Sequence, residues 1–83
     1  MKSAERARNA ILEVVDNQIR LGTPPETKLT FERLIKEGYS ESEARQLIAW
    51  VVAGEMFRIL KYQQPYDEAK FVSALNALPQ LPE

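Results

Sequence analysis

Glu55 is the residue of this sequence best placed to do chemistry, because it interrupts a helical stripe that is otherwise apolar. A carboxylate on a buried helix face loses hydration, which raises its pKa and suits it to proton transfer or ligand binding. Arg33, or the hydroxyl group of Tyr39 or Tyr62, could instead pair with it in a structural role. We expect a buried polar site of Glu55 and Arg33 that is structural; an enzyme or ligand site built around Glu55 is the alternative.

The sequence contains no His and no Cys. Their absence removes the commonest general base, the thiol nucleophile, His-based zinc sites and disulfide bridges. Iron and manganese sites in helical bundles combine Glu with His, and this chain offers Glu13 and Glu55 but no His. We therefore expect no enzymatic activity, no metal and no cofactor.

The charge balance argues against nucleic acid as a partner. Eleven Lys and Arg residues against twelve Asp and Glu residues give a net charge of -1, which supplies no field that attracts phosphates. The predicted helices 24–37 and 41–62, joined by a Gly-containing turn, have the outline of a helix-turn-helix reader. However, Glu41 and Glu43 would face the phosphates, leaving Arg45 and Gln46 for base contacts. Nucleic-acid binding through these two helices is kept as an alternative.

The hydropathy pattern predicts no membrane segment. The N-terminal stretch "MKSAERARNA" lacks the apolar core of a signal peptide, and the longest apolar run, 47–54, is far too short to span a bilayer. These features predict a cytoplasmic protein.

Apolar residues at helical spacing and the helix start and stop signals between them predict a single domain over residues 1–83. Its fold class is all-α, a compact four-helix bundle with a long central third helix, and the helices span about 3–21, 24–37, 41–62 and 67–78. Gly22 and Gly38 are the predicted ends of the first two helices.

Two Thr/Ser-x-x-Glu patterns are predicted to be capping boxes, in which side chains satisfy the free N–H groups of a helix start. Thr23 and Glu26 form the first, with Pro24 at the first helical position, and Ser40 and Glu43 form the second. Before the fourth helix, Asp67 is the predicted cap, and Tyr66 is expected to pack on Phe71. Both patterns are thus explained by helix starts.

The third helix is apolar on nearly all sides, which is typical of a buried helix. In a chain this small, either the other helices surround it or a second copy completes its cover. Trp50, Ala53, Phe57 and Leu60 are the interface candidates, because aromatic side chains beside small ones favour close helix contact. We expect a protein-interaction or structural module with a protein partner, the homodimer being the favoured form; cover by the fourth helix is the alternative.

The order of short motifs resembles a known family. The run "PPE" at 24–26, "RLIKEGYSESEA" at 33–44, "AGEMF" at 53–57, "PYDEAKF" at 65–71 and "LNALP" at 75–79 is similar to uncharacterised small bacterial helical proteins related to domain of unknown function 1841. The resemblance implies a helical fold in a bacterial cytoplasm and gives no activity.

The resemblance also implies a point of departure. Relatives often have His where this chain has Ser42 and Gln46, and a Glu near Asn17. Two His four residues apart would suit a metal, whereas Ser42 and Gln46 are poor ligands. A metal site in relatives would therefore not carry over to this chain.

Overall fold

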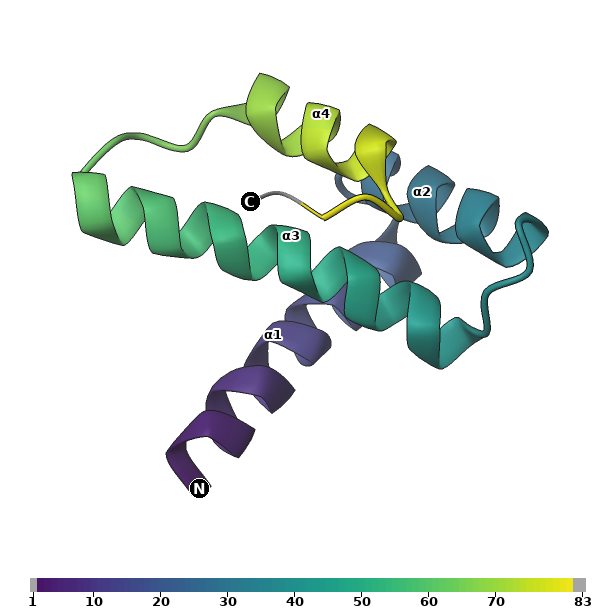
Figure 1. Ribbon diagram of the computed structural model, residues 1–83, viewed down its shortest axis with the longest axis horizontal. Helices are drawn as coiled ribbons and strands as arrows, with labels where there is room; N and C mark the ends of the chain where they lie inside the picture. Colours follow the sequence, from purple (N-terminus) through teal and green to yellow (C-terminus); the bar gives the residue numbers. More distant parts are fainter. Residues whose placement is uncertain (1, 82–83) are drawn as a thin grey trace.

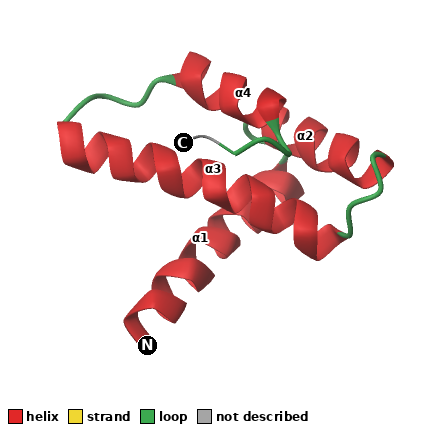
Figure 2. Cartoon of the chain, viewed as in Figure 1, coloured by secondary structure: helices red, strands yellow, loops and turns green. Residues whose placement is uncertain are grey.

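The computed structural model describes residues 2–81 and contains four helices: α1 (Lys2–Leu21), α2 (Pro25–Lys36), α3 (Glu41–Tyr62) and α4 (Glu68–Ala77). Within this part of the chain, helices alternate with short loops and no strand is present (Figure 2). The protein is the all-α four-helix bundle that the sequence predicts. Every predicted helix boundary lies within one residue of the observed one.

Helix α3 is the longest helix and packs against each of the other three. Helix α2 also packs against all of its neighbours, whereas α1 and α4 do not pack against each other in the described residues. In Figure 1, α4 runs above α3 and α1 crosses behind and below it. The prediction of a central third helix is confirmed.

The core draws apolar side chains from all four helices and from the residue after α4. It consists of Val15, Leu34, Ala44, Ile48, Val51, Val52, Phe71, Leu75 and Leu78. Helix α1 contributes one fully buried residue to it, Val15, and all of residues 4–10 are exposed. The first half of α1 therefore stands away from the bundle, as Figure 1 shows.

The second predicted capping box is confirmed at the start of α3. The Oγ of Ser40 accepts a hydrogen bond from the Glu43 backbone N–H at 3.1 Å, and the Glu43 carboxylate accepts one from the Ser40 N–H at 2.9 Å. These hydrogen bonds favour the ionised carboxylate and lower the pKa of Glu43. Ser40 thus fixes the point at which α3 begins.

The predicted start of α4 is also confirmed. The Asp67 carboxylate accepts from the Lys70 N–H at 3.2 Å, and the rings of Tyr66 and Phe71 lie 6.1 Å apart, centroid to centroid. The tilted ring pair anchors the chain that enters α4 to the core, because Phe71 is buried.

The predicted capping box at the start of α2 is wrong. The N-cap is Pro24 and not Thr23, Pro25 holds the first helical position, and no side chain caps this end. Thr23 could be the cap only if Pro24 were helical, but the ring of Pro25 disfavours the helical conformation at the residue before it, and Pro24 is extended, with φ of -70° and ψ of 151°. The helix therefore begins one residue later than the sequence pattern indicated.

Helices α1 and α2 end at the predicted glycines. Gly22 and Gly38 have φ angles of 66° and 103°, in the left-handed region that glycine enters without strain. Helix α3 ends in the same region at Gln63, with φ of 53°. The loop after α3 then carries the chain back over α3 to α4.

Candidate interaction surface

Three large apolar side chains stand exposed on one side of α3. Trp50, Phe57 and Leu60 expose 64%, 63% and 77% of their surface. Together with Ala53 we call them the α3 ridge. The ridge lies on the side of the helix opposite to the buried Ile48 and Val52, so the core of the bundle uses one face of α3 and leaves the other uncovered.

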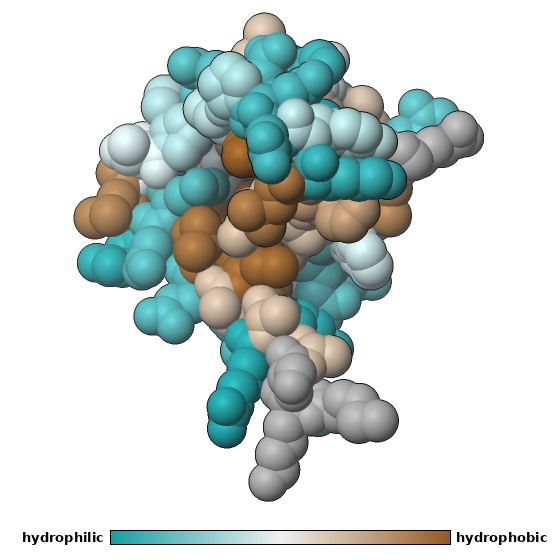
Figure 3. Space-filling view, turned by 90° about the vertical axis from the view of Figure 1, so that its left-hand side faces the viewer, coloured by the Kyte–Doolittle hydropathy of each residue, from teal (hydrophilic) through white to brown (hydrophobic). Residues whose placement is uncertain are grey.

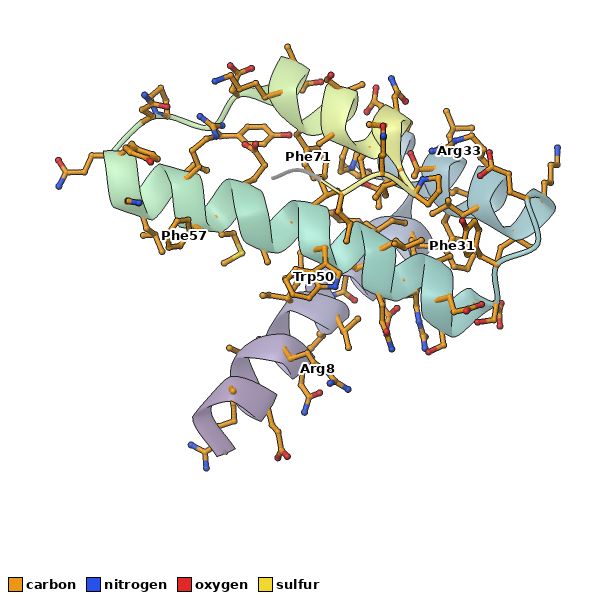
Figure 4. All side chains as sticks on the ribbon, in the orientation of Figure 1. Arg8, Phe31, Arg33, Trp50, Phe57 and Phe71 are labelled. Atoms are coloured by element: carbon orange, nitrogen blue, oxygen red, sulfur yellow. The ribbon has the colours of Figure 1, made fainter. Side chains whose placement is uncertain are left out.

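The neighbouring helices leave the ridge uncovered because they pack on other parts of α3. Helix α4 directs Phe71 and Leu75 into the core on the far side of α3, and α1 diverges toward its own N-terminus. Figure 4 shows Trp50 on the α1 side of α3, Phe57 pointing outward further along, and Phe71 on the α4 side. The alternative that the fourth helix covers the ridge is therefore not what the structure has.

The ridge stands between two hollows. The first, of about 360 Å³, lies between the first half of α1 and α3. The second, of about 820 Å³, runs along the second half of α3 toward α4 and Leu81. Trp50 and Ala53 line both hollows. The first is otherwise lined by Arg8, Ile11, Leu12, Gln46 and Ala49. The second is otherwise lined by Val51, Gly54, Glu55, Phe57, Arg58, Tyr62, Lys70, Ala74 and Leu81.

This end of the molecule is visibly apolar. Figure 3 views the molecule from the side at which α3 ends, and brown apolar side chains gather at the centre, with teal polar side chains above them and on the left. An exposed apolar patch bordered by polar side chains is typical of a protein interface.

The spacing along the ridge is that of a helix-packing seam. Gln46, Trp50, Ala53, Phe57 and Leu60 follow one another at alternating intervals of four and three residues. This 4-3 alternation keeps side chains on one line along a helix and is the pattern by which two helices interlock. The seven-residue spacing of Trp50 and Phe57 in the sequence was the part of this pattern from which the interface candidates were predicted.

Glu55 lines the second hollow and is paired with a residue of its own helix. Its Oε2 accepts from the Arg58 Nη2 at 2.6 Å, and the Arg58 Nη1 donates to the Gln64 Oε1 at 2.9 Å. The two side chains are 13% and 19% exposed. The hydrogen bond to Glu55 raises the pKa of Arg58. Glu55 is therefore the acidic partner in a mostly buried ion pair.

The structure does not bring Arg33 and Glu55 together, which corrects the expected polar site. Arg33 donates to the Glu37 carboxylate at 2.9 Å and to the carbonyl oxygen of Leu75 at 3.0 Å. The hydroxyls of Tyr39 and Tyr62 make no hydrogen bond to Glu55 within the described residues. Sequence reasoning missed Arg58, although a spacing of three residues on a helix was a direct signal for this pair.

Other chemical sites find no support in the described residues. Residues 2–81 hold no group of three acidic side chains placed to bind a metal ion. Arg45, needed for base contacts in the helix-turn-helix alternative, lies 3.5 Å from the Asp16 carboxylate on α1.

None of the described helices has both the length and the apolar character that crossing a bilayer requires.

Comparisons of the chain with protein-family models, curated proteins and solved structures gave no match. The resemblance to domain of unknown function 1841 therefore stays a prediction from the sequence motifs.

Proposed function

We propose that this protein is a non-enzymatic interaction module that self-associates through the α3 ridge. One observation carries the proposal: the bundle leaves Trp50, Phe57 and Leu60 exposed along one line of its longest helix. Aromatic side chains dominate the energetics of protein interfaces, and their exposure in a row costs solubility unless something covers them.

The area available fits a weak dimer. Met56, which is 46% exposed, adjoins the ridge on α3. If a large apolar side chain offers about 200 Å² when fully exposed, the exposed parts of Trp50, Met56, Phe57 and Leu60 come to about 500 Å² per copy. Two copies would then bury about 1,000 Å², which is the lower limit for a specific interface. We expect self-association that depends on protein concentration.

The net charge also permits two copies to meet. A chain with a net charge of -1 repels its own copy weakly, so apolar contact faces little electrostatic opposition. The ion pair of Glu55 and Arg58 supports the non-enzymatic part of the proposal, because the carboxylate is already engaged.

Sedimentation equilibrium over a hundredfold concentration range tests the proposal, with Trp50 fluorescence read in the same samples. Trp50 is the single tryptophan, so its emission reports on the ridge alone. We expect a monomer–dimer equilibrium and a shift of the emission to shorter wavelength as the dimer forms.

Two variants make the test specific to the ridge. Phe57→Ala should weaken the dimer at least tenfold, because it removes an exposed aromatic contact without disturbing the core. Leu29→Ala, at a position on α2 that is 61% exposed, is the matched control and should leave the dimer unchanged. A parent protein that is monomeric at the highest concentration, or equal losses in both variants, would overturn the proposal.

A further inference from the structure

We infer that two copies pair through α3 in antiparallel orientation, about a twofold axis at Ala53 and Gly54, so that Trp50 packs on the partner's Phe57. This inference rests on the self-association proposed above and adds its geometry.

The order of large and small side chains along this part of α3 is the same in both chain directions. Trp50 precedes Ala53 by three residues, and Phe57 follows Gly54 by three, so two small residues stand between two aromatic ones. An antiparallel pair centred here sets small residues against small and each aromatic ring against the other kind. Apart from the adjoining backbone of α3 itself, a Cβ added at Gly54 would meet no atom within 4 Å, so the helix surface is open at the axis. Small residues at a crossing point allow two helices to approach closely.

A parallel pair of α3 helices would also set large side chains against large ones. The charges at the two ends of α3 decide between the parallel and the antiparallel orientation. Glu43 lies seven residues before Trp50 and Lys61 four residues after Phe57, which places both on the ridge side. Parallel helices would set Glu43 beside the partner's Glu43 and Lys61 beside the partner's Lys61. Antiparallel helices bring unlike charges together and oppose the two helix dipoles.

The position of Lys61 supports this orientation. Its Nζ lies 5.4 Å from the centre of the Phe57 ring and 5.2 Å from that of Tyr62. The ammonium group is thus already held over the aromatic end of the ridge, where the acidic end of an antiparallel partner would lie. The hydrogen bonds from Ser40 keep Glu43 ionised and fixed in place.

The antiparallel pair also fills the hollow beside α1. Leu60 follows Ala49 and Ala53 at eleven and seven residues, so it lies on the α1 side of the ridge. A twofold axis across antiparallel helices sets the α1 side of one copy against the α1 side of the other. Leu60, the most exposed ridge residue, would then enter the partner's hollow near Gln46.

Directed disulfide formation tests the orientation, because the chain has no cysteine of its own. Gln46 and Lys61 are both exposed, and the proposed axis places each opposite the other in the partner. Gln46→Cys protein is mixed with Lys61→Cys protein that carries a mass tag, and the mixture is oxidised in a glutathione buffer. We expect mixed disulfides between the two variants, in excess over disulfides within either variant.

Glu32→Cys, at an exposed site on α2, replaces Lys61→Cys in the control mixture and measures disulfides from random collision. Disulfides between two Gln46→Cys chains and between two Lys61→Cys chains, in place of mixed ones, would mean a parallel pair. That result would overturn the inference while leaving self-association intact. A dimer in sedimentation that gives no disulfide above the control would place the interface elsewhere and also overturn it. A monomer in sedimentation would instead overturn the proposed function.

Discussion

Arg33 on α2 donates a hydrogen bond from its Nη2 to the main-chain carbonyl oxygen of Leu75 on α4, at 3.0 Å. The same oxygen also accepts the Leu78 N–H at 3.2 Å, so Arg33 is its second donor, and a cation at the end of a helix complements the helix dipole. The same guanidinium group pairs with Glu37 through Nη1. Arg33 therefore joins the end of α4 to α2, two elements that are far apart in sequence.

Replacement of Arg33 by Met should loosen α4. We expect a loss of about 1.5 kcal/mol in the free energy of unfolding, the scale of a hydrogen bond to a charged group, measured by urea denaturation. Glu37→Gln is the control, because it weakens the ion pair and keeps the bond to Leu75; its cost should be below about 0.5 kcal/mol. Equal losses in the two variants would mean that the contact with Leu75 contributes nothing.

The ion pair of Glu55 and Arg58 should behave as a unit. Glu55→Leu or Arg58→Met alone leaves the other charge without its partner, and we expect each single variant to unfold at a lower temperature than the parent. The double variant removes both charges and should unfold close to the temperature of the parent. Thermal unfolding of the four proteins gives the comparison. Additive losses would show that the two residues act independently.

The two helix starts with a hydroxyl residue should differ in their sensitivity to mutation. Ser40→Ala removes the side-chain acceptor at the start of α3 and should cost about 1 kcal/mol of stability. Thr23→Ala removes no cap, because Pro24 begins α2, and should change stability by less than about 0.5 kcal/mol. Chemical denaturation of both variants provides the test, and a larger effect at Thr23 would contradict the assigned start of α2.

Glu43 should contribute to the loss of stability in acid. Its pKa is lowered from 4.5 in the folded chain by its hydrogen bonds to Ser40, so the unfolded chain holds this proton more tightly. The resulting stabilisation is complete above the unfolded pKa and is lost as the pH falls through the lowered folded value. Glu43→Gln should therefore be less stable than the parent at pH 7, and the difference should shrink below pH 4.5. A difference that is constant with pH would contradict this account.

Much of the fold could be predicted because its signals are local. Ser40, Asp67 and the two glycines act through backbone groups within one helical turn, so their roles can be inferred from short motifs. The start of α2 was mispredicted where two local rules compete, since Pro25 disfavours the helical conformation that a cap at Thr23 requires of Pro24.

The surface depends on longer-range relations that the sequence does not contain. Trp50 and Phe57 could be identified as candidates by spacing, but their exposure follows from the direction in which α1 leaves the bundle and from the ten-residue length of α4. Arg33 has its partner 42 residues away, and no pattern in the sequence links it to a main-chain oxygen on α4.

The lack of packing between α1 and α4 has a consequence for how this sequence can change over time. Residues on these two helices share no direct contacts in the described structure, so the effects of substitutions in α1 and α4 on folding should add. The two helices can therefore accumulate mutations independently. A change on α3 or α2 meets residues of every other helix at once, and the mutations that these two helices tolerate depend on what the rest of the chain has already accepted.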